Sequence, residues 1–304
     1  MSEDNNTADT SSSCASCGIA KVDDIKLKEC DDCDLVKYCS VDCERDHKSS
    51  HKEDCKKRAA ELRDEILFKQ PESTNLGDCP ICMLPLSLDL SQSTMMACCS
   101  KMVCNGCGHA NQVREIEDAR VPSCPFCREL LPTTKEGCDK QRMKRMEAND
   151  PVAMCREGRE QYEKGDYSSA FEYLTKAAEL GDVAAHYWLS RLHHDGHILE
   201  KEMGKVIHHM EEAAIGGHPK ARHNLGWHEG NNGRYERAVK HLIIAAKLGL
   251  DDSIKTLMEN FKGGFVQKDE LAAALRAHKA AVDATKSPQR EVAEEYNRKW
   301  SSDD

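Results

Sequence analysis

The sequence of 304 residues has few aromatic residues, no long apolar segment and no export signal at its start. Phe, Trp and Tyr together make up only 5% of the residues. No segment approaches the roughly 18 consecutive apolar residues that a membrane-spanning helix needs. The first 13 residues, MSEDNNTADTSSS, are polar and acidic and lack the basic start and apolar stretch of a signal peptide. These absences predict an intracellular protein, cytoplasmic or nuclear, that does not act at a membrane.

Positive charge is also scarce. The chain has 43 Lys and Arg against 53 Asp and Glu, which gives a formal net charge of −10. Non-specific binding to nucleic acid requires a clustered cationic surface, and DNA reading by a helix requires a basic recognition helix. Neither is present, so we expect the partners to be proteins rather than nucleic acid.

Cysteine, in contrast, is abundant. Sixteen of the 17 cysteines lie between Cys14 and Cys138, and the rest of the chain contains only Cys155. Because disulfides rarely persist inside the cell, so many thiols indicate metal binding. A CxxC turn holds two sulfurs at the separation that tetrahedral zinc needs, about 2.3 Å from each sulfur to the metal. Five such pairs occur: Cys14/Cys17, Cys30/Cys33, Cys79/Cys82, Cys104/Cys107 and Cys124/Cys127.

The first cluster spans residues 14–55 and contains eight ligand-type side chains, enough for two tetrahedral sites. Its last two members, His51 and Cys55, are spaced by one helical turn and therefore face the same way. With the YCS at residues 38–40, the pattern resembles the MYND zinc finger. The resemblance implies two interleaved zinc sites, one of Cys14, Cys17, Cys39 and Cys43 and the other of Cys30, Cys33, His51 and Cys55. Lys48 stands where members of that family often have a tryptophan that helps to bind proline-rich peptides.

The second cluster resembles an all-cysteine RING finger over residues 79–128. The resemblance implies a cross-brace in which one zinc is held by Cys79, Cys82, Cys104 and Cys107 and the other by Cys98, Cys99, Cys124 and Cys127. The adjacent cysteines are unusual for that family, and His109 or a water could replace one of them. Four zinc ions are expected in the whole chain.

RING fingers dock a ubiquitin-conjugating enzyme, and the resemblance assigns this role to three residues. Ile81 matches the apolar contact of the first zinc loop, Pro125 matches the second zinc loop, and Arg128 matches the cation that bridges the enzyme and ubiquitin. The tryptophan that RING fingers often carry on their central helix is missing, which leaves Val113 or Ile116 as an apolar contact.

The second half of the chain repeats itself. KAAELGD at 176–182, EAAIGGH at 212–218 and AAKLGLD at 245–251 align, and a second register places small residues at Ala153, Ala185, Ala221 and Ser253. Two registers per period predict two helices per unit, and the small residues let these helices approach closely. The glycines that follow the AA motifs are suited to end the second helix in the left-handed conformation. The pattern resembles about four Sel-like repeats, relatives of the tetratricopeptide repeat, over residues 150–285.

These patterns predict several packing details as well. Leu189, Leu225 and Leu257 share one register and are expected in the core, as are Trp188 and Trp227, although either tryptophan could line a groove. The many histidines of this half, including His193, His194, His197, His208 and His209, are expected on the surface. A disordered start over residues 1–13, a helical linker over 56–78, a solvated linker over 129–149 and a capping helix with a tail over 286–304 complete the chain.

The fold predicted is multidomain: two small zinc-stabilised cross-brace fingers followed by an all-α solenoid of helix pairs. The function predicted is recruitment of a ubiquitin-conjugating enzyme by the second finger while the solenoid binds a substrate. This mechanism needs no covalent catalytic residue, and none is expected. The alternative is a non-enzymatic adaptor in which zinc only stabilises protein-binding folds. A methyltransferase of the kind that carries a MYND finger is excluded because no segment remains to form its catalytic domain.

Overall fold

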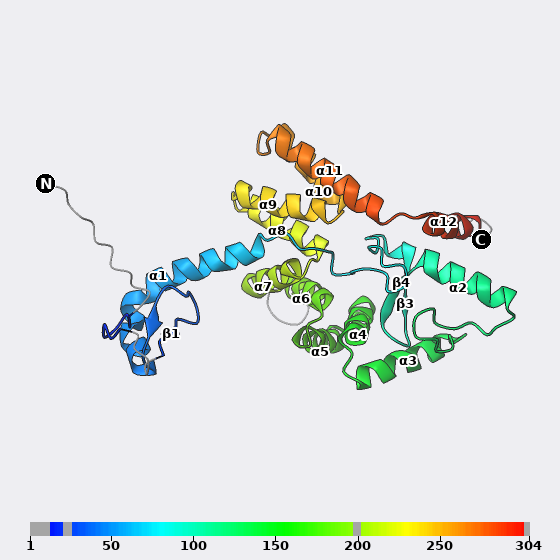
Figure 1. Ribbon diagram of the computed structural model, residues 1–304, viewed down its shortest axis with the longest axis horizontal. Coiled ribbons are helices and arrows are strands. Elements are labelled where there is room, and N and C mark those ends of the chain that lie inside the picture. Colours follow the sequence, from blue (N-terminus) through cyan, green and yellow to red (C-terminus); the bar gives the residue numbers. More distant parts are fainter. Residues whose placement is uncertain (1–12, 21–25, 197–201, 301–304) are drawn as a thin grey trace. The chain divides into compact units, whose positions relative to one another are not determined.

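The computed structural model describes residues 13–20, 26–196 and 202–300 (Figure 1). These residues belong to two compact units, Met1–Lys69 and Gln70–Asp304. Nearly all of the predicted disordered start, the end of the predicted tail and His197 lie outside the described residues. No helix in the described ranges is long and apolar enough to cross a membrane.

The first unit contains a small two-stranded sheet and one long helix. Strand β1 (Lys28–Glu29) pairs antiparallel with β2 (Lys37–Tyr38), and helix α1 spans Val41–Leu67. The side chain of Ser40 caps α1 by accepting a hydrogen bond from the backbone N–H of Cys43. The sequence predicted a helical linker over residues 56–78, and α1 continues without a break from the ligands His51 and Cys55 through the first part of this linker to Leu67. No glycine or proline occurs within α1, so nothing ends the helix there.

The second unit begins with a compact cysteine-rich region. It contains the short helix η2 (Leu90–Gln92), a hairpin of β3 (Ser93–Met96) and β4 (Lys101–Cys104), and helix α2 (Asn105–Glu117). The buried side chains of Leu86, Met96 and Val103 pack with the cysteines to form its core. A core this small leaves most of the stability to bound metal.

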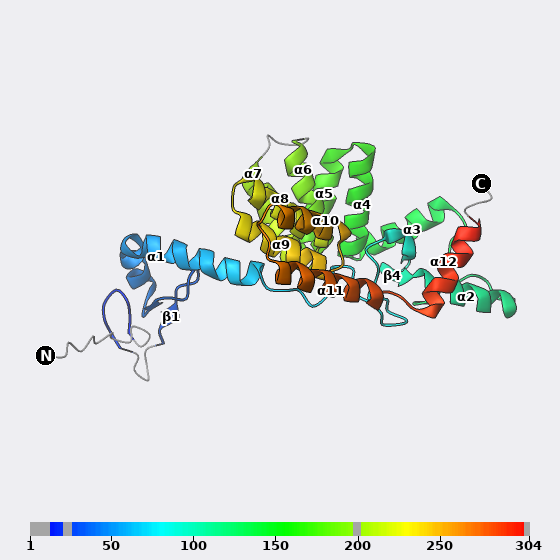
Figure 2. The same cartoon turned by 90° about the horizontal axis from the view of Figure 1, so that it is seen from above.

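The remainder of the second unit is helical, and its helices pack in consecutive antiparallel pairs (Figures 1 and 2). The four pairs confirm the predicted solenoid of helix pairs. They consist of α4 (Pro151–Lys164) with α5 (Tyr167–Glu179), α6 (Val183–Asp195) with α7 (Met203–Ile215), α8 (Pro219–Asn231) with α9 (Tyr235–Lys247), and α10 (Asp251–Lys262) with α11 (Lys268–Ala284).

The repeated alanines and glycines end the second helix of each of the first three pairs in the same way. Gly181, Gly217 and Gly249 all adopt positive φ, between 82° and 91°. The residue after each glycine donates its N–H to the carbonyl of the alanine five positions earlier: Ala177, Ala213 and Ala245, at 2.9, 2.9 and 3.2 Å. This is the Schellman arrangement, in which glycine is favoured because it has no Cβ. The predicted helix ends are therefore confirmed.

The small residues of the second register are buried where helices meet. Ala153, Ala185, Ala221 and Ser253 are all buried, as predicted. A further small position, Gly158 in α4, recurs as Gly226 in α8. A Cβ at Gly158 would lie 2.7 Å from Leu174 of the partner helix α5, so only glycine allows this close packing without a shift.

Two of the predicted linker and end segments pack differently from expectation. Helix α3 (Lys135–Glu147) does not present only a solvated face, because Arg142 is buried and forms ion pairs with Glu157 and Glu160 of α4. Helix α12 (Pro288–Trp300) packs against α2 of the cysteine-rich region rather than capping the solenoid, as Figures 1 and 2 both show.

The tryptophan and histidine predictions are only partly correct. Leu189, Leu225 and Leu257 are buried as predicted, and Trp188 packs against the core. Trp227 is 65% exposed, so its assignment to the core is wrong. Conversely, His193 and His241 are buried. Because imidazole has a large apolar ring, it can be buried between helices in its neutral form.

Burial of the histidines makes the stability of the solenoid dependent on pH. Burial, together with nearby Arg222 and Arg237, lowers the pKa of His241 from its ordinary value of 6.5 to about 3, and burial lowers the pKa of His218 to about 4. The unfolded chain therefore binds more protons than the folded chain below pH 6.5. The stabilisation is complete above pH 6.5 and is lost as the pH falls toward the folded pKa values. At pH 5, neutral burial of His241 lowers the free energy of unfolding by about 2 kcal/mol relative to pH 6.5 and above.

We expect hydrogen exchange in α8 and α9 to accelerate between pH 6.5 and pH 5, after correction for the intrinsic exchange rate. Replacing His241 by Gln should weaken this dependence and leave the part that comes from His218. Exchange that is equally pH-dependent in the variant would contradict the assignment to His241.

Candidate metal centres

Four groups of side chains bring their ligand atoms together, and these are the four groups that the sequence pattern predicts. Within each group all ligand atoms lie within 4.8 Å of one another. The groups are Cys14, Cys17, Cys39 and Cys43; Cys30, Cys33, His51 and Cys55; Cys79, Cys82, Cys104 and Cys107; and Cys98, Cys99, Cys124 and Cys127. In both regions the groups interleave along the chain, which is the cross-brace arrangement.

Four of the five CxxC pairs form the same tight turn. In each turn the residue after the second cysteine adopts positive φ: Gly18, Asp34, Met83 and Arg128. Its N–H donates to the carbonyl of the first cysteine at 2.9 to 3.1 Å. The fifth pair is different, because Cys104 ends β4 and Cys107 lies in the first turn of α2.

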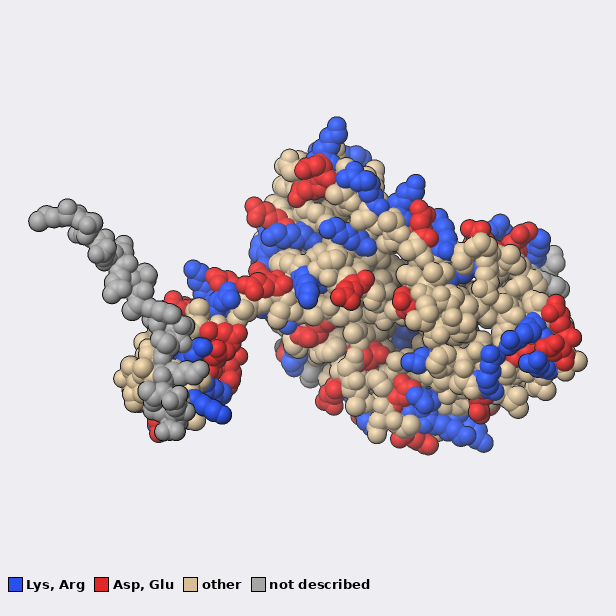
Figure 3. All heavy atoms as spheres, viewed as in Figure 1, with Lys and Arg blue, Asp and Glu red and all other residues tan. Residues whose placement is uncertain are grey.

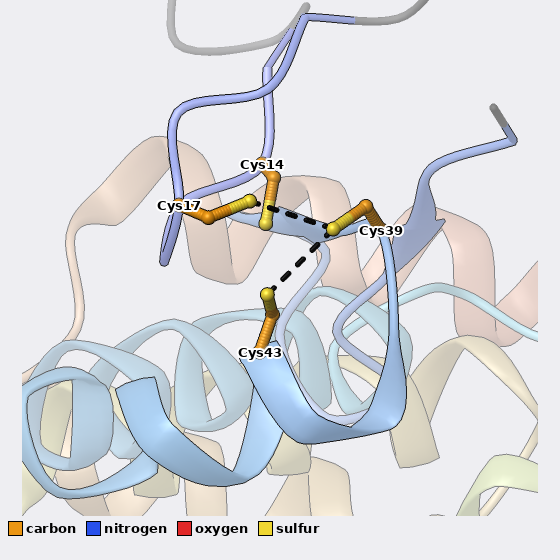
Figure 4. A group of neighbouring side chains, drawn as sticks. All are labelled: Cys14, Cys17, Cys39 and Cys43. Atoms are coloured by element: carbon orange, nitrogen blue, oxygen red, sulfur yellow. Dashed lines mark hydrogen bonds between the residues drawn. The ribbon is translucent and has the colours of Figure 1, made fainter.

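In the first region, helix α1 carries three of the ligands: Cys43, His51 and Cys55. The sulfurs of Cys17 and Cys43 lie 3.5 and 3.6 Å from that of Cys39, and Figure 4 shows the four sulfurs of this group pointing toward one another. In the second group the sulfurs of Cys30 and Cys55 lie 3.8 Å apart. His51 is buried, with Nε2 3.1 Å from the sulfur of Cys33.

His47 belongs to neither group but stacks on His51, and its Nδ1 lies 3.1 Å from the hydroxyl of Tyr38. The sequence pattern left His47 without a role. Stacking by His47 restricts how the His51 ring can turn, and the contact with Tyr38 holds His47 in place.

In the second region, the hairpin turn between β3 and β4 carries Cys98 and Cys99. Both belong to the fourth group: Cys99 lies 3.8 Å from Cys124, and Cys98 lies 3.4 Å from Cys127. His109, the alternative ligand, instead packs against Tyr296 of α12 with ring centroids 4.7 Å apart. The structure therefore favours the assignment of both adjacent cysteines.

The distances between donor atoms fit zinc. Four sulfurs bound tetrahedrally at about 2.3 Å must lie about 3.8 Å from one another. Six sulfur pairs in the four groups lie 3.4 to 3.8 Å apart, and all ligand atoms of a group lie within 4.8 Å of one another. All the cysteines are free thiols rather than disulfides. The sites therefore have the donor chemistry and geometry of structural zinc, with the fourth position of each filled by the protein.

The pKa values of the cysteine thiols also indicate that the groups need a bound cation. Hydrogen bonds that the Cys39 thiol donates to the sulfurs of Cys17 and Cys43 raise the pKa of Cys39 to about 12, and burial raises the pKa of Cys55 to about 12. Burial also raises the pKa of Cys14, but backbone N–H groups lower it by more, to about 6. Four thiolates thus cannot ionise together at neutral pH unless a divalent ion offsets their charge.

The three residues predicted to contact a conjugating enzyme lie on the two zinc loops of the second region. Ile81 is 41% exposed, Pro125 is partly exposed and Arg128 is exposed. The guanidinium of Arg128 donates to Oδ1 of Asn111 on α2 at 2.9 Å, so one face of Arg128 is engaged within the finger.

Helix α2 combines a buried polar face with exposed apolar residues. Glu115 is buried and accepts hydrogen bonds from the N–H and hydroxyl of Ser123, which lower its pKa. Val113 and Ile116 are exposed, and Met83, Phe126 and Leu130 add further exposed apolar side chains on and beside the zinc loops. A finger that exposes this many large apolar side chains is suited to bind another protein.

Comparison with known families identifies two of the three regions. Residues 14–55 match the family model of the MYND finger. Residues 153–182, 183–218 and 219–250 match the Sel1 repeat. The chain carries a MYND finger and Sel1 repeats. The second cysteine-rich region, residues 79–127, lies outside both matches. We refer to it below as the second finger. No curated protein sequence matches the chain.

Two solved structures are similar to parts of the chain. A Sel1 repeat protein from Oxalobacter formigenes is 26% identical over 48% of this chain and 64% of its own length, with a TM-score of 0.42. A protective antigen of uropathogenic Escherichia coli with an SLR fold is 20% identical over 57% of this chain and 37% of its own length, also with a TM-score of 0.42. The chain thus spans less than two thirds of either protein.

Proposed function

We propose that the protein is a zinc-stabilised interaction protein whose second finger recruits a ubiquitin-conjugating enzyme while the Sel1 repeats hold a substrate. It would act in the cytoplasm or nucleus, where thiols stay reduced and available to zinc. The observation that carries the proposal is the pair of zinc loops. They present Ile81 and Pro125 on a cross-braced finger with Arg128 at the end of the second loop.

The surface chemistry supports protein partners. On the face drawn in Figure 3, Lys and Arg side chains are interspersed with Asp and Glu rather than gathered into a cationic surface. The chain carries a formal charge of −10, which disfavours binding to a phosphate backbone. In the MYND finger, Lys48 is exposed where a tryptophan would build a peptide groove, so we assign partner binding to the second finger and the repeats.

The reaction would place no covalent intermediate on this chain. A substrate lysine amine attacks the thioester that joins ubiquitin to the conjugating enzyme, an amide forms, and the enzyme's thiol leaves. The finger would contribute by holding the charged enzyme in one orientation, which lowers the entropic part of the barrier.

The test is ubiquitin discharge by the purified, zinc-loaded protein with a panel of charged conjugating enzymes. At least one enzyme should discharge faster in its presence, and Ile81→Ala should reduce this stimulation about tenfold, because a buried aliphatic anchor commonly dominates such a contact. Ile66→Ala is the matched control, since Ile66 is a similarly exposed isoleucine in the other unit. No stimulation with any enzyme, or equal stimulation by Ile81→Ala, would contradict the proposal.

One observation favours a second candidate, a non-enzymatic adaptor. The hydrogen bond from Arg128 to Asn111 occupies the cation that would otherwise bridge the enzyme and ubiquitin. The adaptor predicts that partners bind through the second finger or the repeats without accelerating discharge of any conjugating enzyme.

A further inference from the structure

The C-terminal helix α12 is joined to the second finger by contacts that the sequence pattern gave no reason to expect. It packs along α2, which begins between two cysteines of the third group. Ala293 of α12 is only 1% exposed, and the Tyr296 ring contacts His109. Gly106 of α2 makes the close approach possible, because a Cβ there would lie 3.0 Å from the backbone of Arg290.

Arg290 reaches from the first turn of α12 into the first zinc loop. Its guanidinium donates to the carbonyl oxygens of Leu84 at 3.0 Å and Pro85 at 2.6 Å. The same group donates to the sulfur of Cys82 at 3.4 Å and to the carbonyl of Thr285 at 2.7 Å. One side chain thus connects the end of α11, the zinc loop and a ligand sulfur.

The net charge of the zinc-bound third group explains how the contact with Arg290 would stabilise the site. A zinc ion bound by the four thiolates of Cys79, Cys82, Cys104 and Cys107 would carry a net charge of −2. A guanidinium beside one thiolate offsets part of that charge, and a hydrogen bond to a ligand sulfur disfavours its protonation and departure. Arg290 is suited to this because it remains charged and its planar fork can serve several acceptors.

We propose that Arg290 stabilises bound zinc by donating to a ligand sulfur and to the carbonyls of the zinc loop, so that docking of the C-terminal helix and retention of zinc by the third group are coupled. The helix holds the loop that carries Ile81 in its zinc-bound form, and the bound zinc in turn holds the helix. By thermodynamic linkage the two effects are equal in free energy. The coupling does not depend on the proposed ligase function, since it concerns only the zinc site and α12.

The test measures zinc loss from the full-length protein in the presence of a chelator, with the number of bound ions followed by native mass spectrometry. Arg290→Ala should lose one ion of the four about tenfold faster than the unmodified protein, which is the low end of the effect of removing a hydrogen-bond partner of a metal ligand. Arg290→Lys keeps the positive charge but loses the planar guanidinium that donates to several acceptors, and it should lose that ion at an intermediate rate. Arg298→Ala is the matched control, because Arg298 lies on the same helix and is 73% exposed.

A second variant separates helix docking from the bonds of Arg290. Ala293→Glu places a charge in the buried contact with α2 and should release α12 together with Arg290, again accelerating loss of one ion. Hydrogen exchange should then increase in α12 and in residues 79–86 together.

If Arg290→Ala loses zinc at the unmodified rate, the proposal is overturned. It is also overturned if only Ala293→Glu accelerates the loss, because packing alone would then explain the effect. None of these readouts involves ubiquitin, so they are independent of the proposed function.

Discussion

Removing zinc with a strong chelator is expected to unfold the MYND finger while the Sel1 repeats remain folded. Apart from cysteines, the buried core of this finger contains little more than Tyr38. Structural zinc sites contribute about 10–16 kcal/mol of binding free energy, which far exceeds the stability that so small a core can provide. The helices of the solenoid bury their own apolar residues and contain no zinc ligand.

Hydrogen exchange resolved by peptide is the direct measurement. Residues 26–55 should exchange fully within the shortest labelling time after zinc removal, whereas α4 to α9 should keep their protection. Restoring zinc should restore the protection of the finger. Protection that persists in residues 26–55 without metal would show that the finger is stable on other grounds.

Replacing Leu189 by Ala should destabilise the solenoid by about 3 kcal/mol, because the residue is fully enclosed and its truncation leaves a cavity. Leu189 is 2% exposed and packs with Leu174 and Leu192 in the core between the first two helix pairs. In a repeat array of this size we expect the midpoint of thermal unfolding to fall by roughly 10 °C.

Trp227→Ala is the informative comparison for this prediction. Trp227 was expected in the core, but its exposed side chain should change the unfolding free energy by no more than about 0.5 kcal/mol. Thermal unfolding of both variants, followed by circular dichroism with zinc present, measures the difference. Equal destabilisation by the two substitutions would contradict the packing described.

Spacing alone predicted the CxxC pairs, whereas the grouping of these pairs into four sites came from the resemblance to known zinc fingers. A CxxC turn fixes two sulfurs locally, as the shared turns ending at Gly18, Asp34, Met83 and Arg128 demonstrate. The repeats were equally visible, because Ala177, Ala213 and Ala245 recur with the glycine that ends each helix. Both patterns could be predicted because residues close together in the sequence determine the backbone conformation of the CxxC turns and of the helix ends.

What the sequence did not predict depends on contacts between distant segments. Arg290 and Leu84 are separated by 206 residues, and nothing in the pattern of α12 identifies α2 as its packing partner. Arg142 lies in a segment that was predicted to be a solvated linker, because the sequence does not show that Glu157 and Glu160 of α4 lie beside it. Burial of His241 likewise depends on how neighbouring helices stack, which a single repeat does not reveal.

Exposure at Trp227 has a different origin, because the register of the repeat itself predicts it. Leu225 follows Leu189 by 36 residues, and the same step aligns Trp227 with Arg191, which is also exposed. Trp188 packs against the core whereas Trp227 does not, although both are aromatic residues on the first helix of a pair.

The zinc content of the intact protein tests most directly the central claim that two cross-braced fingers each bind two zinc ions. Native mass spectrometry of the purified chain should show four zinc ions, and X-ray absorption should show fifteen sulfur ligands and one nitrogen ligand shared among the four sites. Cys99→Ser should lower the affinity of one site without affecting the MYND finger. A protein with only two or three tightly bound ions, or with substantially more nitrogen ligation, would contradict the assignment of the second finger.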